Sequence, residues 1–526
     1  MRKKIGVSHA SVFYHAAVMA GSGLILQALG FFYRMMQSRM VGAEGMGWFS
    51  LVMPVYSIIT SVSLAGVSMA VNHLSAEADA LGDTRALPRI FRAGAATFLG
   101  LFLVMAGAVL LFRENLAESL LGNRGIAGTL LLFLPCIFLT GFENLSKSVF
   151  YGVGRVRTPV VSEIGEQTVR IAAVGAFLTA MKPEKPEEAV AAIILGMTLS
   201  EVFSSLFMTF SLTRMFSRMK AGSGRFERSI GRSMASLSLP VSLSAIVGNL
   251  ISSAITVSLP GRLEAGGMEA AGAVASLGAI NAMASPLLSL PLAFVYPIGS
   301  AVAPRIASGL ARGNAGDAER KAGKAFETAA LIAFPACLAL FPVGRFLLGR
   351  LFHVYPEERD LLLLTVSAML AGIQAVSGAV LTGYEKHRVS MLSGLLGSLV
   401  HLGLMWRLAA DPRLGVTGYL LGCAAGNLLP AFINTLYIVF SLGLSLPFGK
   451  ILMRPLLMAV LSFLPERAVF RMAGESVFSA ALALFIAFAV DLMLLYVWDY
   501  RPIRYLKTLI PKNTPPGDHL YRGEDL

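Results

Sequence analysis

The chain has 526 residues, of which 55% are hydrophobic and only 14% are charged, whereas a soluble globular chain carries about 25% charged residues. Apolar stretches of about 20 residues, long enough to span a membrane, recur from residue 11 to residue 499, which excludes a soluble fold and predicts an all-α, polytopic integral membrane protein. The net charge of +13 is carried mostly by short loops, where Lys and Arg set the topology and meet anionic lipid, so we expect no nucleic-acid partner.

Fourteen membrane spans are predicted along the chain. Their approximate ranges are 11–36, 47–71, 93–112, 127–151, 160–181, 189–213, 233–259, 272–304, 325–349, 361–383, 389–408, 415–442, 451–471 and 476–498. The first apolar run is interpreted as a full span and not as a cleaved signal peptide, because it continues to residue 36. The eighth span is overlong and contains Pro286, Pro291 and Pro297, which predicts one kinked helix.

The distribution of basic residues predicts the topology. With the N-terminus in the cytoplasm, the segments on the inside hold more than twice as many Lys and Arg residues as the outside loops. Cytoplasmic loops carry such an excess. We therefore expect a multi-pass protein of the bacterial cytoplasmic membrane with both termini in the cytoplasm.

An internal repeat relates the two halves of the chain. YGVGRVRTP (151–159), after the fourth span, matches TGYEKHRVS (382–390), after the tenth, and Gly82-Asp83 corresponds to Gly316-Asp317. Such repeats are typical of secondary transporters. The predicted parts are a six-helix N-lobe at 1–215, a basic cytoplasmic linker at 216–232, a six-helix C-lobe at 233–442, two further helices within 443–499, and a disordered Pro-rich tail at 500–526.

Charged residues inside the predicted lobes gather in the N-lobe. A charge at the bilayer centre costs about 2.5–3.5 kcal/mol on insertion scales, so such side chains tend to face a wet cavity or a partner. Glu143 and Lys147 share one helix face, and in SEIGEQTVRI (162–171) Glu163, Glu166 and Arg170 share another. These charges either fix helix packing as ion pairs or form a polar path through lipid, and the sequence leaves both interpretations open.

The candidate substrate-binding residues combine intramembrane cations with intramembrane acids. They are Arg34, Arg39, Glu143, Lys147, Glu166, Arg170 and Glu201. The chain has no HExxH motif, P-loop or nucleotide fingerprint, its seven histidines are scattered, and its three cysteines lack metal-ligand spacing. We therefore expect no enzymatic activity, cofactor, metal or nucleotide, and work driven by a proton or sodium gradient, the membrane potential or a downhill substrate.

Four stretches carry a family resemblance: residues 29–78, which begin LGFFYRMMQSRMVGAEGMGW, and residues 143–171, 237–267 and 285–309. Together they resemble the stage V sporulation protein B-like polysaccharide-biosynthesis flippases of the multidrug/oligosaccharidyl-lipid/polysaccharide (MOP) exporter superfamily. The resemblance implies a V of two six-helix lobes, with the last two helices forming a lipid groove in the branch of the lipid II flippase. It also implies a peptidoglycan-related function, in which an undecaprenyl-diphosphate-linked oligosaccharide crosses the cytoplasmic membrane by alternating access.

The resemblance also bears on the arginines. Arg39, in SRMVGA, matches the arginine of a similar turn in the lipid II flippase branch, and Arg34 lies one position from another of its cavity arginines. That branch places further cavity arginines in spans two and eight, where this chain has none. Lys147 and Arg170 are therefore expected to supply the basic charge that meets the diphosphate.

Three other functions remain open at the level of sequence. A cation-coupled multidrug exporter of the same superfamily would use Glu166 and Glu201 to bind a cationic drug or a proton. A non-transporting scaffold of a cell-wall synthesis complex would need no intramembrane charge. A membrane transferase is more remote, because the outside loops are too short to hold its site.

Overall fold

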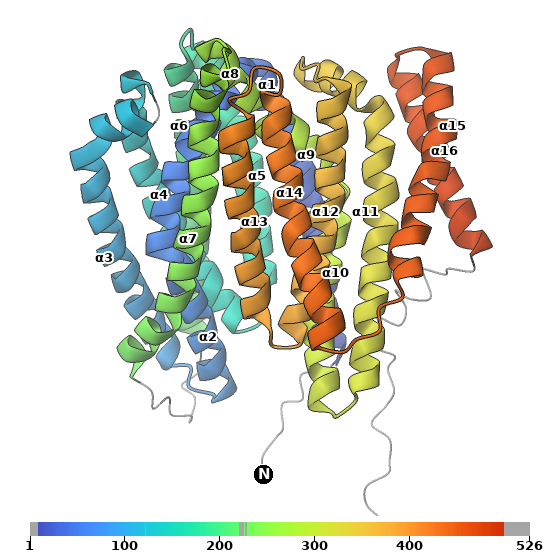
Figure 1. The fold of residues 1–526 in the computed structure, drawn as a ribbon. Helices are drawn as coiled ribbons and strands as arrows, with labels where there is room; N and C mark the ends of the chain where they lie inside the picture. The colour runs from blue at the N-terminus through green and yellow to red at the C-terminus, as the bar shows by residue number, and fades with distance from the viewer. Residues whose placement is uncertain (1–8, 121, 220–225, 227–228, 499–526) are drawn as a thin grey trace, which may run out of the picture.

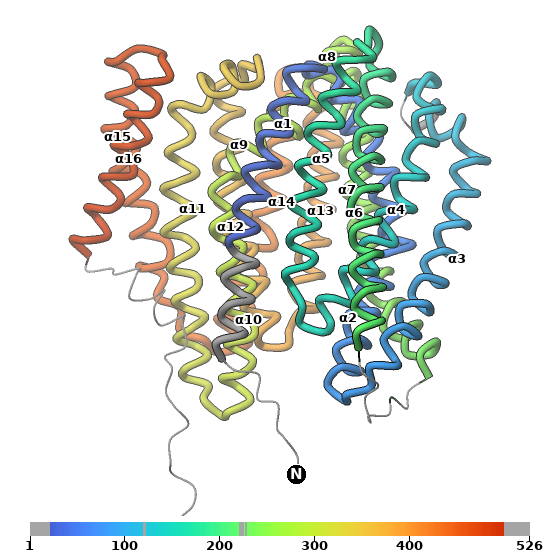
Figure 2. Tube along the Cα trace, turned by 180° about the vertical axis from the view of Figure 1, so that it is seen from behind, coloured from blue at the N-terminus to red at the C-terminus, as the bar shows by residue number. Residues whose placement is uncertain are grey.

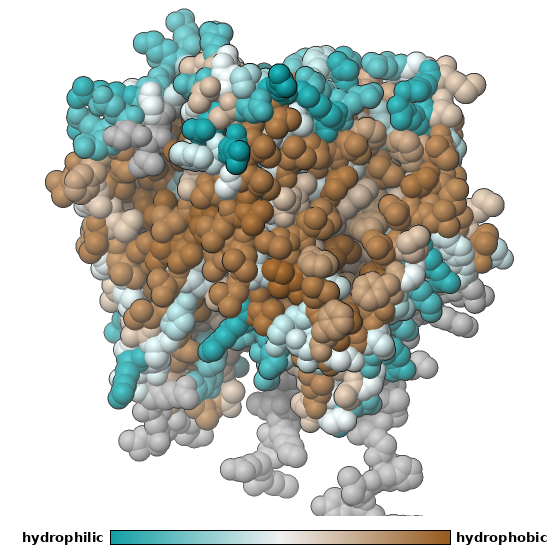
Figure 3. Space-filling model, in the orientation of Figure 1, coloured by the Kyte–Doolittle hydropathy of each residue, from teal (hydrophilic) through white to brown (hydrophobic). Residues whose placement is uncertain are grey.

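The computed structural model describes residues 9–120, 122–219, 226 and 229–498, which form helices and connections without a strand. The helices cross a slab whose middle is covered by hydrophobic side chains and whose two ends are polar (Figure 3). A bilayer imposes this arrangement, because backbone polar groups inside lipid must be satisfied within a helix. The prediction of an all-α, polytopic membrane protein is confirmed.

Helices of the first half lie at the centre and along one side of the molecule, where α7 (Ile230–Ala265) of the second half packs against them (Figure 1). Helix α1 (His9–Thr60) contains two rods joined at Gly42, where a φ of 71° requires glycine for an unstrained turn. The second rod continues through η1 (Ser61–Ala65) and α2 (Gly66–Ala80). The other elements of this half are α3 (Ala86–Asn115), η2 (Leu116–Leu120), η3 (Arg124–Ile126), α4 (Ala127–Gly152), α5 (Arg157–Met181) and α6 (Pro186–Arg218).

The next six rods follow the same plan. Helix α7 (Ile230–Ala265) is followed by the predicted kinked rod, which is interrupted near its prolines. It consists of α8 (Ala270–Gly278), η4 (Ala279–Ala284), α9 (Ser285–Leu288) and α10 (Leu292–Ala311). The remaining elements are α11 (Ala315–Phe352), α12 (Glu358–Gly383), α13 (His387–Leu408), α14 (Val416–Leu436) and η5 (Tyr437–Ser441).

A final hairpin lies beside α11 at the edge of the molecule (Figures 1 and 2). It consists of η6 (Gly449–Met453), α15 (Arg454–Ala473) and α16 (Val477–Val497). Eleven described stretches are long and apolar enough to span a membrane; one of them, Gly21–Ala80, holds two rods. The charge-bearing helices α5 and α15 add the last two of the fourteen predicted rods.

The predicted domain limits remain predictions. The tail at 500–526 and residues 220–225 and 227–228 of the linker at 216–232 lie outside the described residues. One described linker residue, Phe226, is buried, and its backbone N–H donates to the carboxylate of Asp83 at 2.9 Å. The linker is thereby fixed to the turn between α2 and α3.

Glycines bring the two halves together at the turn of α1. A Cβ atom on Gly47 would stand 2.0 Å from the carbonyl oxygen of Val274 in α8, and one on Gly278 would stand 2.1 Å from that of Ala43. Because no larger residue fits at either position, the second rod and α8 pack backbone against backbone. This contact closes one end of the space between the lobes.

Candidate functional site

Lys147 lies at the centre of a buried charge cluster between α4 and α5. Its Nζ atom is 2.7 Å from the carboxylate of Glu143, 3.5 Å from that of Glu166 and 3.6 Å from that of Glu163. Glu143 precedes Lys147 by four residues on one face of α4, as the i,i+4 spacing predicts, and only 2% of Glu143 is exposed. The single ammonium group therefore compensates three carboxylates, two of them on the neighbouring helix.

Arg170 extends the same cluster to α6. Its guanidinium pairs with Glu166 one turn earlier and donates from Nη2 to Oε1 of Glu201 at 3.0 Å. Nε donates to the hydroxyl of Ser200 at 3.1 Å, and Nη1 donates to Oε1 of Gln167 at 3.4 Å. A guanidinium has five N–H donors, so these contacts occupy four of them.

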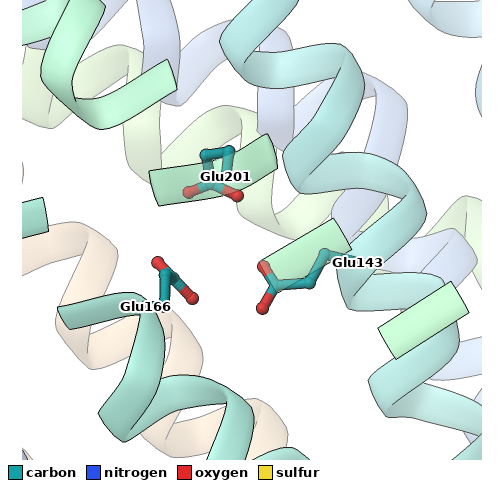
Figure 4. A group of neighbouring side chains, drawn as sticks. All are labelled: Glu143, Glu166 and Glu201. Atoms are coloured by element: carbon teal, nitrogen blue, oxygen red, sulfur yellow. The ribbon is translucent and has the colours of Figure 1, made fainter. Parts of the chain in front are cut away.

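The cluster contains more acid than base. Glu143, Glu166 and Glu201 each place an oxygen within 4.8 Å of the others, from three different helices (Figure 4). With Glu163 there are four carboxyl groups for two cations, Lys147 and Arg170. Uncompensated charge is costly away from water. The three facing carboxylates therefore form a place where a proton or a small cation can be held, and Oε2 of Glu201 lacks a hydrogen-bond partner among the described residues.

Arg170 also reaches a cavity of about 490 Å³ between the lobes. The cavity is lined from α1, α5 and α6 on one side and from α7 and η4 on the other. Its charged lining residues among those described are Arg34 and Arg170. The other polar lining groups include neutral amides and hydroxyls: Gln37, Ser50, Ser57, Gln167, Asn249, Ser252, Ser253, Thr256 and Asn281.

The helices are irregular where they face this cavity. Pro54 lies within the second rod, about two turns before the π-helical η1, and the corresponding rod of the other lobe has the π-helical η4, which contains Asn281. Single π turns are frequent at functional sites, and broken helices in corresponding positions of two repeats mark the binding sites of many transporters. The side chain of Asn249 donates to the hydroxyl of Ser61 at 2.6 Å, so η1 also orients a polar group of α7.

The structure brings together six of the seven predicted residues. Arg34 lines the cavity next to the cluster, and the other five form the cluster itself. Arg39 lies apart: its guanidinium donates to the backbone carbonyls of Leu351 and Arg350 at 2.9 and 2.8 Å. It thus caps the last turn of α11 and ties the turn of α1 to the second lobe.

Several polar groups of the cavity and of the C-terminal hairpin were not predicted from the sequence. Asn249 and Asn281 are single amides in apolar helices, and that isolation was the only signal available. Glu466 of α15 and Asp491 of α16 were also overlooked, although both are acids inside predicted spans. They lie in the C-terminal hairpin, away from the cavity.

Comparison with known proteins places this arrangement in a family. Residues 14–310, more than half of the chain, match the family described as "Polysaccharide biosynthesis protein". The chain belongs to this family. It is 24% identical over 426 residues to stage V sporulation protein B of Bacillus subtilis (strain 168), which covers 79% of this chain and 81% of that protein.

Solved structures give the fold. The lipid II flippase MurJ in an inward closed conformation superimposes with a TM-score of 0.70 at 13% identity, over 92% of this chain and 98% of MurJ. An inward-facing multidrug resistance transporter of the MATE family, of the MOP superfamily, gives a TM-score of 0.64 at 18% identity, over 81% of this chain and 98% of that transporter. This chain of the polysaccharide biosynthesis family thus has the MOP transporter fold. The predicted family and the predicted fold are both confirmed.

Proposed function

We propose that the protein is a flippase that moves an undecaprenyl-diphosphate-linked oligosaccharide, a lipid II-like peptidoglycan precursor, across the cytoplasmic membrane by alternating access. The observation that carries this proposal is the lining of the cavity. Two guanidinium groups, Arg34 and Arg170, stand among neutral amides and hydroxyls. Guanidinium groups bind phosphate oxygens in pairs, and neutral hydrogen-bonding groups suit sugar hydroxyls.

Arg170 connects this cavity to the acid cluster. Four of its five N–H donors are already occupied, two of them by carboxylates. A diphosphate that accepts hydrogen bonds from both terminal nitrogens of the guanidinium must therefore displace Glu166 or Glu201. The displaced carboxylate lies in a cluster that already holds more acid than base, so it takes up a proton. Substrate binding and proton binding are coupled in this proposal, and each strengthens the other by the same factor.

Alternating access rests in this proposal on the contacts between the lobes. At the turn of α1, the glycine contacts and the Arg39 cap close the space between the lobes on the side that we assign to the outside. The headgroup would enter from the cytoplasm, bind at Arg34 and Arg170, and leave when this end opens. The prenyl chain would stay in lipid, along the hairpin of α15 and α16.

A cation-coupled multidrug exporter is the second candidate, and the acid cluster is the observation that favours it. A cationic drug would need free carboxylates facing the cavity. Instead, Glu143, Glu166 and Glu201 do not line it, and each is engaged by Lys147 or Arg170. The charge that the cavity presents is positive, which favours an anionic substrate.

Complementation of a bacterium depleted of its lipid II flippase tests the proposal. Wild type and the variants Arg34→Gln and Arg170→Gln are expressed at matched membrane levels. Arg359→Gln, an exposed arginine paired with Glu357, is the matched control for loss of one positive charge. We expect rescue by wild type and by Arg359→Gln and loss of rescue by both cavity variants. Rescue by all four, or no rescue by wild type together with reduced drug accumulation in an efflux-deficient host, contradicts the flippase proposal.

A further inference from the structure

The C-terminal hairpin carries a second group of acids, outside the cavity. On α15, Ala459, Ser462, Glu466 and Phe470 recur at intervals of three or four residues, and each is at most 7% exposed. This spacing forms one face of a helix, and α15 packs on both α11 and α16 (Figure 2). Glu466, which is 0% exposed, therefore lies in the seam where three helices meet.

Neither carboxylate oxygen of Glu466 has a hydrogen-bond partner among the described residues, and Oδ1 of Asp491 on α16 has none either. Asp491 interacts with the hydroxyl of Ser462, which lies one turn before Glu466 on α15. It also interacts electrostatically with Glu466. The two acids thus face the same seam from two helices. Both lie inside the helices of the hairpin, where an unpaired buried carboxylate costs several kcal/mol.

The neighbouring charged groups point elsewhere. On α15, Arg467 lies over the ring of Phe463 and Arg454 over the ring of Trp498. The other charged groups of the hairpin and of the adjoining part of α11 are exposed or lie by other partners: Arg345, Arg350 and Arg471 are exposed, and Glu327 lies near Lys450 and Arg454. Of the titratable groups, Tyr496 is exposed, and the free thiol of Cys337 on α11 is buried. The seam therefore has two acids and no described cation to compensate them.

We propose that Glu466 and Asp491 form a proton-binding site that fastens α16 to the rest of the bundle. A protonated carboxyl is neutral and gains an O–H donor, so it can remain in the seam. A metal cation fits less well, because it needs about six oxygen ligands, whereas the carbonyls of α15 and α16 are used within the helices. Loss of the proton leaves buried negative charge, and the seam separates to admit water.

This site is independent of the substrate cavity. The buried small residues of α16 that face the seam, Ala480, Ala483 and Ala487, let the two helices approach closely, which small residues do in membranes. The close fit leaves ionised acids without room for a hydration shell. Protonation thereby controls whether the last helix stays attached, whatever occupies the cavity.

Thermal unfolding of the purified full-length protein as a function of pH tests the proposal. In this proposal folding binds a proton at Glu466, so stability falls as the pH rises. Between about pH 6 and about pH 9 the melting temperature of wild type should fall by several degrees more than that of Glu466→Gln. Glu475→Gln, in the exposed connection of the hairpin, is the matched control and should keep the wild-type slope. Equal slopes for all three overturn the proposal.

A second measurement uses unmodified protein, in case Glu466→Gln does not fold. Dicyclohexylcarbodiimide enters apolar regions and reacts with protonated carboxyl groups, and the adduct is located by peptide mass spectrometry. We expect an adduct on Glu466 at about pH 7 that decreases at higher pH. The absence of an adduct on Glu466 at every pH between about 6 and about 9 overturns the proposal.

Discussion

Replacement of Glu201 by Gln should strengthen diphosphate binding. Oε1 of Glu201 accepts from Arg170 at 3.0 Å in a site where only 3% of the residue is exposed. A hydrogen bond to a charged group contributes about 1.5–3 kcal/mol, and one between Arg and a neutral amide somewhat less, about 0.5–1.5 kcal/mol. The substitution therefore weakens the competition for Arg170 by about 1–1.5 kcal/mol, which corresponds to a Kd roughly five- to tenfold lower.

The assay is equilibrium binding of undecaprenyl diphosphate to detergent-purified protein at constant salt. Glu143→Gln is the matched control, because Glu143 is equally buried and equally charged but pairs with Lys147 and not with Arg170. Its affinity should change much less. If both variants bind the diphosphate more tightly by the same factor, the gain comes from the loss of one negative charge and not from release of Arg170. If Glu201→Gln binds no more tightly than wild type, Arg170 does not exchange a carboxylate for phosphate.

Three further outcomes are expected. Lys147→Met should cost about 3–5 kcal/mol of stability, because it leaves buried carboxylates without a cation. The double variant Lys147→Met/Glu143→Gln should recover part of that loss. Thermal melting, followed with a dye that reacts with the buried cysteines, measures both effects. The backbone N–H groups around the Asp83 carboxylate lower its pKa. The stability from Asp83 is thus present above the ordinary value of about 3.9 and is lost as the pH falls through the lower folded value, so Asp83→Asn should flatten the acid side of the melting-temperature profile. Gly278→Ala should abolish complementation, because its Cβ would meet backbone at 2.1 Å, whereas Gly272→Ala, with its nearest contact at 3.6 Å, should not.

Much of the candidate site could be predicted from spacing within single helices. Glu143 and Lys147 share a face of α4, and Glu166 and Arg170 share a face of α5, and both pairs form as the i,i+4 rule predicts. The partner across the interface was not predictable in this way. Glu201 has no charged neighbour along α6 at helical spacing, and it pairs with Arg170 only because α5 packs against α6.

Arg34 and Arg39 likewise differ in contacts that only the packing of helices determines. The two lie five residues apart on α1, and sequence treated both as substrate-binding candidates. In the structure Arg34 lines the cavity, whereas Arg39 donates to Arg350 and Leu351, more than 300 residues away. Which of them can meet a substrate depends on how the end of α11 lies against the turn of α1.

The sequence by itself determined the class of the fold: long apolar stretches must become helices in lipid, because each helix satisfies its own backbone without help from its neighbours. It also determined the family, through residues along more than half of the chain. Only the tertiary structure decided which charges compensate one another. Helical periodicity fixes the face on which a side chain lies, but contacts between helices arise from packing among segments that are far apart in the chain. Glu466 illustrates this, since its lack of a partner became visible only when α11, α15 and α16 were placed together.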